Sequence, residues 1–384
     1  MAPNTKAIIQ ETTQINIMPN NLLHEFEQYA PEFEQAALEV LRSGWYILGS
    51  RLSAFESEFA SYVGSSHCIG VASGLDSLWI GMKCAGITAG DEVIVQANTY
   101  IASVMGITIN GATPVFVEPD EYYSIDAEKI EAAITEKTKA ILVVHLYGIP
   151  CMMDQIVSIC QRHRLMLIED CAQSHGATYE MNGHAQMTGT FGDIGCFSFY
   201  PTKNLGAFGD GGCVITSSDE LDKKLRIFRN YGSQEHYKNE IVGMNSRLDE
   251  MQAGLLSVKL KHLDEINEER RQIAKRYDER ITNEKFILPL VRPNSECVYH
   301  QYVIRTKDLE TRMSLIGFLK DKGIGTMIHY PIPPHLSHAY EYLGYRRGDF
   351  PITEHYADTV LSIPMYNGYT EEEQEYVIKA LNEF

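Results

Sequence analysis

Short apolar runs alternate with segments of helical period over most of the chain. The runs cover residues 68–72, 92–96, 114–117, 140–145, 165–169, 196–200 and 213–216. Continuous Val- and Ile-rich runs separated by helices are typical of parallel strands whose sheet is covered by helices on both faces. The pattern therefore predicts an α/β fold with a mostly parallel central sheet flanked by helices.

The remaining segments predict how this sheet is framed. Helical period is present at 33–41 and 55–62, and a long charged helix is predicted over 248–280. After residue 285, a strand at 299–305 and helices at 312–322 and 371–381 predict a smaller α+β unit. We expect an N-terminal arm at 1–24, useful if at all at a subunit contact, a large domain at 25–260, and a small C-terminal domain at 261–384.

Length and composition fit a globular enzyme of two domains. The chain has 384 residues, of which 44% are hydrophobic and 22% are charged. Its net charge of −18 argues against a nucleic-acid partner, because binding phosphate backbones requires clustered Lys and Arg. The eight scattered cysteines form no CxxC pair and fit small buried hydrophobes in a reducing compartment. With no signal-like or membrane-spanning stretch, we expect a cytoplasmic protein with no membrane partner.

A lysine and an acid follow two of the predicted strands. Lys203 comes after the aromatic run 196–200, and Asp170 ends the run that begins at Leu165. A lysine and an acid delivered by neighbouring strands suit an enzyme that uses pyridoxal phosphate (PLP). The lysine forms a Schiff base with the cofactor, and the acid keeps the pyridine nitrogen protonated so that the ring accepts electrons.

Small residues at the ends of other strands provide candidate phosphate contacts. Gly74 and Leu75 lie between the strand 68–72 and a helix, where free backbone N–H groups and the helix dipole favour anions; a plain strand-to-helix turn is the alternative. Ser198 lies just before Lys203 and can add a hydroxyl, or can be satisfied within its own strand. Tyr100 follows the strand 92–96 and can stack on a cofactor ring or pack in the core.

Two further motifs do not change this picture. The glycine-rich stretch 206–212 lacks the strand-then-helix context of a dinucleotide site and fits a tight loop after Lys203. His329, His335 and His338 match no usual zinc spacing, so we expect no metal site.

Several motifs in order give the chain a family resemblance. They are Gly44-Trp45-Tyr46-Ile47-Leu48-Gly49, Ser73-Gly74-Leu75-Asp76-Ser77-Leu78, Glu169-Asp170-Cys171-Ala172-Gln173-Ser174-His175-Gly176-Ala177, residues 197–212, residues 243–253 and Leu361-Ser362-Ile363-Pro364. With these motifs the chain resembles the PLP-dependent nucleotide-sugar aminotransferases of the DegT/StrS type, which have aminotransferase fold type I.

The resemblance assigns roles to these residues. It implies that Lys203 binds the cofactor covalently and later moves the proton, that Asp170 pairs with the pyridine nitrogen, and that Gln173 lies near the ring with Tyr100 over its face. It further implies that Gly74, Leu75 and Ser198 hold the phosphate together with Asn245 of the neighbouring subunit. A homodimer with a shared active site would follow, with L-glutamate and 2-oxoglutarate as the amino donor and its product.

The resemblance also suggests a substrate class. Residues 203–212 and the Gly74-Leu75-Asp76-Ser77-Leu78 run look most like enzymes that aminate C3 of dTDP-3-keto-6-deoxyhexoses for deoxyamino sugars of lipopolysaccharide or other surface polysaccharides. Candidate substrate contacts are Tyr46, Arg229, Tyr231 and His329, although each also fits an ordinary structural position.

Alternative functions stay open at this level. A UDP-linked 3-keto sugar or a 4-keto sugar is a possible substrate. A sugar dehydratase of the same fold is disfavoured, because the resemblance says that such relatives carry His in place of the lysine. Among other fold-type-I reactions, a cysteine desulfurase is disfavoured because no cysteine lies in a mobile-loop setting, whereas an amino-ring synthase acting on a carbocyclic ketone stays open. A PLP-binding sensor without turnover is disfavoured by the acidic composition and the absence of a DNA-binding segment.

Overall fold

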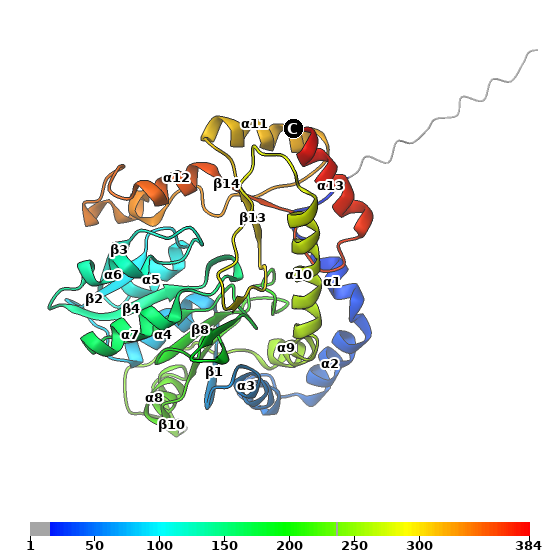
Figure 1. Cartoon of the computed structure of the whole chain (residues 1–384). Helices are drawn as coiled ribbons and strands as arrows, with labels where there is room; N and C mark the ends of the chain where they lie inside the picture. Colours follow the sequence, from blue (N-terminus) through cyan, green and yellow to red (C-terminus); the bar gives the residue numbers. More distant parts are fainter. Residues whose placement is uncertain (1–15, 236) are drawn as a thin grey trace, which may run out of the picture.

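A seven-stranded sheet forms the centre of the molecule (Figure 1). The computed structural model describes residues 16–235 and 237–384. The strands lie in the order β1 (His67–Val71), β9 (Gly212–Thr216), β8 (Ile194–Ser198), β5 (Met166–Asp170), β4 (Thr138–Val144), β2 (Glu92–Gln96) and β3 (Thr113–Val117). β9 runs in the opposite direction to the other six strands of this sheet. The predicted mostly parallel sheet is confirmed, and each predicted run forms one strand within two residues of its bounds.

Alternate residues of the strands point to different helical layers. Val93 and Val95 pack in one apolar cluster with helices α4 (Gly74–Cys84), α5 (Ile101–Thr108) and α8 (Asp219–Phe228). Ile94 lies in another cluster with α6 (Ala127–Ile130) and α7 (Met153–His163). Because successive side chains of a strand face opposite sides, the sheet is buried on both faces, as its continuous apolar runs require.

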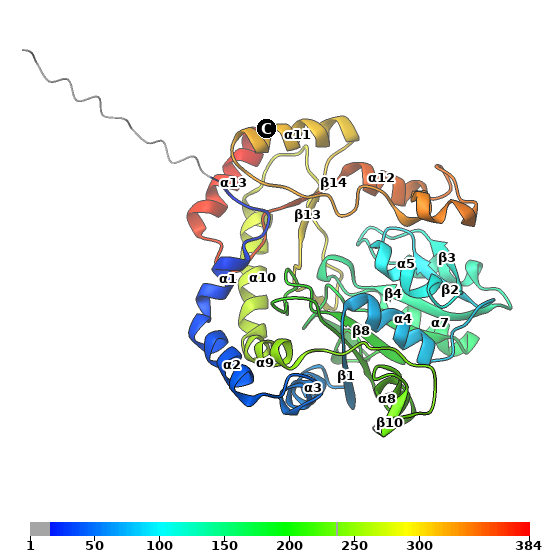
Figure 2. The same cartoon turned by 180° about the vertical axis from the view of Figure 1, so that it is seen from behind.

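The N-terminal helices cover the end of the sheet at β1. Helices α1 (Leu22–Gln28) and α2 (Ala30–Ser43) lead to α3 (Ser50–Val63), which packs with α9 (Glu250–Lys261) in one apolar cluster beside β1, β8 and β9. Figure 2 shows α1 and α2 on the outer side of α10 (Leu263–Arg280), and α3 below them next to β1.

The C-terminal residues form a second apolar core. It contains β13 (Tyr302–Arg305), β14 (Val360–Ile363), α10 (Leu263–Arg280), α11 (Leu309–Asp321) and α13 (Glu371–Glu383), while α12 (Pro351–Thr359) leads into β14. Strands β13 and β14 pair antiparallel. We infer from this separate core that the C-terminal residues form the expected small domain.

The segment at residues 16–21 contacts this C-terminal core. Ile17 is buried in its core, its N–H donates to the carbonyl of Gly323 (2.8 Å), and its carbonyl accepts from Gly325 (2.8 Å). Helix α1 then begins at Leu22, after the side chain of Asn21 caps its first N–H groups. Within the expected arm, Ile17 thus packs on the C-terminal core, and residues 1–15 lie outside the described residues.

Two details of the predicted elements are wrong. The single helix over 248–280 is two helices, α9 and α10, because the backbone leaves helical geometry at His262 (φ −103°, ψ 1°), whose ring stacks on Tyr29 (4.0 Å between centroids). The strand predicted from Tyr299 begins at Tyr302, since Tyr299 has a left-handed backbone (φ 42°).

Small strands without apolar runs were not predicted. Strands β6 (Thr178–Met181), β7 (His184–Met187) and β12 (Ser295–Glu296) form a three-stranded sheet, and β10 (Ser233–Glu235) pairs with β11 (Lys238–Asn239). Most of their side chains are exposed or half-buried, so no hydrophobic pattern marks them.

The eight cysteines form no disulfide bond in the structure. All eight cysteines are free thiols, and all are buried except the half-buried Cys84. No helix within 16–235 or 237–384 combines the length and the apolar character needed to cross a bilayer.

Glu250 fastens the start of α3 to the start of α9. Its buried carboxylate accepts hydrogen bonds from the backbone N–H groups of Gly49 (2.7 Å), Arg51 (2.9 Å) and Leu52 (3.0 Å). The first N–H groups of a helix have no partner within the helix, and an anion there also interacts favourably with the helix dipole. The carboxylate therefore stabilises a contact between segments about 200 residues apart.

Glu250→Ala should lower the free energy of unfolding by about 3 kcal/mol, because it leaves three backbone N–H groups, one buried and two part-buried, without their acceptor. Urea unfolding followed by circular dichroism measures this loss. Glu58→Ala, on the exposed face of the same helix α3, is the matched control and should change stability by less than about 0.5 kcal/mol. Equal losses in the two variants would contradict the role given to Glu250.

Candidate active site

The carboxyl ends of the parallel strands open into a cavity of about 630 Å³. Residues that follow β1, β2, β4, β5 and β8 line one side, and residues 300–301, 327–330 and 362–365 of the C-terminal part line the other. Ligands bind at this edge of open α/β sheets, so the cavity is the candidate active site.

The cavity brings together eight of the twelve residues expected at the site. They are Gly74, Leu75, Tyr100, Asp170, Gln173, Ser198, Lys203 and His329. The described cavity does not include Tyr46, Arg229, Tyr231 or Asn245.

Asp170 is a buried acid at the end of β5. Its carboxylate accepts hydrogen bonds from the hydroxyl of Ser103 on α5 (2.7 Å) and from the N–H of Ala172 (3.1 Å). The Ser103 hydroxyl also lies 2.7 Å from that of Thr99. Burial raises the pKa of Asp170 above its usual value, while these hydrogen bonds and the charge of Lys203 oppose the rise.

Lys203 reaches the same cavity from the loop after β8. The loop is fixed by hydrogen bonds from Phe199 to the carbonyl of Gly211 (2.8 Å) and from Ala207 to that of Phe199 (2.8 Å). The glycine-rich stretch thus returns the chain from Lys203 into β9, as expected. Burial lowers the pKa of Lys203 to about 8, and the charge of Asp170 opposes this shift. A substantial fraction of the amine is therefore neutral near physiological pH, as a nucleophile or a base requires.

The start of α4 lies directly against the end of β8. A Cβ at Gly74 would be 2.4 Å from the Cβ of Ser198, so only glycine permits this approach. The side chain of Ser73 caps the helix through the N–H of Asp76 (3.1 Å). Backbone N–H groups at the helix start and the nearby hydroxyl together form a cradle whose donor set suits a phosphate.

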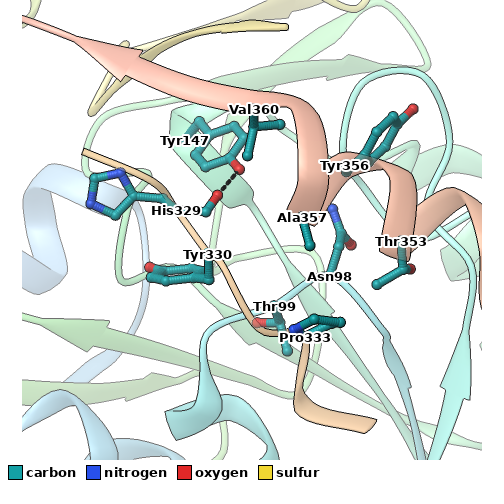
Figure 3. Close-up of a pocket in the computed structure, with 10 residues that line it drawn as sticks. All are labelled: Asn98, Thr99, Tyr147, His329, Tyr330, Pro333, Thr353, Tyr356, Ala357 and Val360. Carbon is teal, nitrogen blue, oxygen red and sulfur yellow. Dashed lines mark hydrogen bonds between the residues drawn. The ribbon is translucent and has the colours of Figure 1, made fainter. Parts of the chain in front are cut away.

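Gln173, which lines the cavity, forms hydrogen bonds with two tyrosines. The Oε1 of Gln173 accepts from the N–H of Tyr147 (2.6 Å), and its Nε2 donates to the hydroxyl of Tyr330 (3.0 Å). The hydroxyl of Tyr147 donates to the carbonyl of His329, as Figure 3 shows. The rings of Tyr100 and Tyr330 lie 5.0 Å apart.

His329 faces the cavity in its neutral form. Its Nδ1 lies 2.8 Å from the hydroxyl of Ser362. Burial, with a smaller effect of the charge on Lys203, lowers the pKa of His329 to about 4. The ring is therefore a hydrogen-bonding group and not a cation at neutral pH.

Arg229 has a structural position away from the cavity. It is buried, and its guanidinium donates to the carboxylate of Glu56 and to the carbonyl of Gly70 (2.7 Å). Glu56 also accepts from the N–H of Gly70 (2.8 Å), so the pair ties α3 to β1. The expectation that Arg229 contacts substrate is not supported, because its donors serve the fold.

The other three residues lie on the surface of the single chain. Tyr46 donates to the carbonyl of Leu41 (3.1 Å), and the guanidinium of Arg247 lies over the ring of Tyr231 (5.5 Å). Asn245 is exposed on the same segment as Arg247.

One group of potential metal ligands occurs in the described part of the chain. It consists of the buried His145, Glu169 and Cys171. The Glu169 carboxylate already accepts from the N–H groups of Gly189 (2.7 Å), Phe191 and Gly192 (both 2.8 Å). It also lies 3.0 Å from the Nε2 of His145, whose Nδ1 accepts from the N–H of Cys151 (3.0 Å). These atoms are committed to the fold, so the group does not fit a metal site.

Comparison with known families identifies the class of protein. The model of the DegT/DnrJ/EryC1/StrS aminotransferase family matches residues 27–382. The chain belongs to this family. The resemblance, the fold class and the enzyme class expected from the sequence are thereby confirmed.

Individual members of the family are similar over nearly the whole chain. The dTDP-3-amino-3,6-dideoxy-alpha-D-galactopyranose transaminase of Aneurinibacillus thermoaerophilus is 49% identical over 93% of this chain and 96% of its own length. The crystal structure of DesV from S. venezuelae in complex with a ketimine intermediate has a TM-score of 0.92 and 42% identity, and the match covers 96% of this chain and 98% of DesV. The structure of NtdA from Bacillus subtilis with the bound cofactor PMP has a TM-score of 0.88 and 30% identity, over 97% of this chain and 86% of NtdA.

Ser103, Tyr147, His300 and Tyr330 are cavity-region residues that the sequence did not point to. Each contacts a residue that was expected at the site. Ser103 lies inside a helix and His300 lies 97 residues from the lysine that it contacts. No local pattern marks such residues, because their roles depend on tertiary contacts.

Ser103→Ala should move the acid limb of the pH profile of turnover to higher pH. The hydroxyl stabilises the ionised form of Asp170, so its loss raises the pKa of that carboxyl further. Because turnover requires the carboxylate, the variant loses activity at a higher pH than the wild type does when the pH is lowered. We expect turnover at pH 6 to drop about tenfold. Steady-state kinetics from pH 5 to 9 measures this.

Ser174→Ala is the matched control, because Ser174 is buried nearby but its hydroxyl contacts that of Thr188 (2.8 Å) and not Asp170. It should leave the acid limb in place. An unmoved limb in Ser103→Ala would refute the link to Asp170.

Proposed function

We propose that this protein is a PLP-dependent aminotransferase that transfers the amino group of L-glutamate to C3 of a dTDP-3-keto-6-deoxyhexose. The products are 2-oxoglutarate and a dTDP-3-amino-3,6-dideoxyhexose. One observation carries the proposal: in a chain of this aminotransferase family, Asp170 and Lys203 share a buried cavity with the cradle formed by Gly74 and Ser198.

The donor groups of the cavity fit PLP. The backbone N–H groups of Gly74 and Leu75 and the hydroxyl of Ser198 would hold the phosphate, and Asp170 would pair with the pyridine nitrogen. Tyr100 and Gln173 line the space between these two ends. When bound, PLP supplies an electron sink that stabilises negative charge at the carbon next to the amine.

Lys203 would act first as the attachment point and then as the base. Its lowered pKa leaves the amine ready to take a proton from the amino acid and to return it to the cofactor side. The same residue would run these proton transfers in reverse on the keto sugar, which gives ping-pong kinetics.

Asp170 and the shape of the cavity set the conditions for this chemistry. Burial excludes water around the carboxylate, so its charge acts strongly on a nearby ring nitrogen. The cavity of about 630 Å³ leaves room for a sugar beside the cofactor. His329 and Tyr330 line the wall where hydroxyl groups of a sugar can be bound.

A second subunit would complete the site. Lys203 is the only lysine or arginine among the described residues that line the cavity, although glutamate and a nucleotide diphosphate both carry negative charge. Asn245 lies on an exposed segment together with Val242 (94% exposed) and Met244 (48% exposed), which a monomer would leave in water. A homodimer would cover these side chains and bring Asn245, with Tyr231 and Arg247 beside it, to the phosphates of the neighbouring site. We place the enzyme in the cytoplasm, where its free buried thiols remain reduced.

The test is an absorption spectrum of the purified protein before and after addition of L-glutamate. The visible band of bound PLP should decline and the shorter-wavelength band of the amine form should rise. Addition of a dTDP-3-keto-6-deoxyhexose should then restore the visible band. Restoration only by a UDP-linked or a 4-keto sugar would refute the substrate assignment. A spectrum that does not respond to glutamate would favour a dehydratase-like reaction or a sensor.

A subunit-mixing experiment tests the shared site. Lys203→Ala and Asn245→Ala homodimers should each have little activity. After dissociation and reassociation of equal amounts, random pairing should restore roughly a quarter of wild-type activity, because mixed dimers contain one unaltered site.

No recovery, with mixed dimers verified by native mass spectrometry, would show that Asn245 serves its own subunit. Each homodimer mixed with itself is the control.

A further inference from the structure

A buried histidine, His300, lines the cavity from its C-terminal side and lies next to Lys203. His300 is 5% exposed, and its Nε2 lies 3.4 Å from the Nζ of Lys203. Its other ring nitrogen, Nδ1, lies 3.3 Å from the Oδ1 of Asn204, the residue that follows Lys203. Long contacts of this kind are common in catalytic sites before substrate binds.

The direction of these hydrogen bonds is fixed by backbone carbonyls. Asn267 donates its Nδ2 to the carbonyl of His175 (2.9 Å), so its Oδ1 is an acceptor. Asn204 donates its Nδ2 to this Oδ1 (2.8 Å) and also to the carbonyl of Val298 (2.8 Å). A carbonyl can only accept, so neither amide can be turned around without the loss of a buried hydrogen bond.

The tautomer of His300 follows from this order. Because both hydrogens of the Asn204 amide are used, its Oδ1 must accept, and the proton of the neutral imidazole must lie on Nδ1. Nε2 then carries a lone pair, which faces the Nζ of Lys203.

We propose that His300 is a positioning residue for Lys203, which accepts a hydrogen bond from the lysine through Nε2 and exchanges no proton with it. The inference rests on the proposed role of Lys203 in transamination. One N–H of the neutral Lys203 amine donates to His300. The lone pair and the second N–H of the amine are then free to interact with a molecule bound in the cavity. A lysine on a flexible stem is thereby held in one orientation each time it is released from the cofactor.

The surroundings keep His300 neutral. The groups that face the two side chains are Asp170, His175, His329 and Arg270, and Arg270 donates to the carbonyl of His300 (3.3 Å). Burial and then the positive charges of Lys203 and Arg270 hold the pKa of His300 well below its usual value. Asp170 is the one acid in this set, and its charge acts mainly to retain the proton on Lys203. An imidazolium is therefore unfavourable, and the ring serves as an acceptor only.

The consequence can be measured on the lysine itself. A lone pair stabilises the ammonium form of Lys203 more than the amine form, so removal of the acceptor should make the ammonium a stronger acid. We compare the full-length apoenzymes of the wild type, His300→Leu and His300→Gln by competitive labelling with acetic anhydride from pH 6 to 10. Mass spectrometry of the Lys203 peptide gives the midpoint for each protein.

The wild-type midpoint should lie near 8. His300→Leu should increase the acid dissociation constant of Lys203 about fivefold, which moves the midpoint to lower pH. His300→Gln, which can present its amide oxygen to Nζ, should remain within about twofold of the wild type.

His175→Leu is the matched control. His175 is as buried as His300, and burial together with the charge of Lys203 lowers its pKa to about 3, but neither of its ring nitrogens bonds to the lysine. It should leave the midpoint unchanged. A shift of less than twofold in His300→Leu, or a shift of equal size in His175→Leu, would overturn the proposal.

A second measurement reads the protonation of the His300 ring directly. ¹⁵N spectra of the wild-type holoenzyme with labelled histidine should show one ring with its proton on Nδ1 at every pH from 6 to 9. The signal is assigned by its loss in His300→Gln. A proton on Nε2, or a titration of this ring within that range, would refute the acceptor role. The acetic anhydride labelling of the apoenzyme requires neither turnover nor a sugar. The shift of the Lys203 midpoint therefore tests the role of His300 whether or not the proposed substrate is correct.

Discussion

The attraction between Asp170 and Lys203 depends on a cavity that excludes much of the water. Burial alone would neutralise both groups, since it raises the pKa of the acid and lowers that of the lysine. Their mutual charge opposes each shift, and the hydrogen bond from Ser103 supports the carboxylate. The site thus places a carboxyl group whose hydrogen bonds favour ionisation beside a lysine whose pKa is lowered to about 8. The layers of helices that cover both faces of the sheet are what make this low-dielectric environment possible.

The fold supplies the two groups from strands that are neighbours in space. Strands β5 and β8 pair in parallel, so Asp170 at the end of one and the loop that carries Lys203 after the other emerge at the same edge. The C-terminal part closes the cavity from the opposite side with His300, His329 and Tyr330. Precision at the site therefore depends on contacts between the two parts of the chain, such as the hydrogen bond from Gln173 to Tyr330.

The strands of the central sheet could be predicted because each is a continuous apolar run, and Asp170 and Lys203 could be placed because they directly follow two of these runs. The break at His262 could not be predicted, since Leu260, Leu263 and Ile266 are all buried and continue the helical pattern across it. The guanidinium of Arg229 is a group that commonly binds phosphate, but tertiary packing places it against Glu56. The contact of His300 with Lys203 could not be predicted for the same reason, because it forms only when distant segments of the chain come together.

Glu169 and Asp170 are adjacent in the chain but face opposite sides of the sheet. Glu169 points to four donors in the loop at 189–192 and in His145, whereas Asp170 points to Ser103 and the cavity. If β5 shifted its register by one residue against its neighbours, the shorter side chain of Asp170 would face the donors that now bind Glu169. The longer side chain of Glu169 would then point into the cavity. The hydrogen bonds of Glu169 therefore stabilise the observed register of β5. A residue with no part in the chemistry decides which of two consecutive carboxylates performs it.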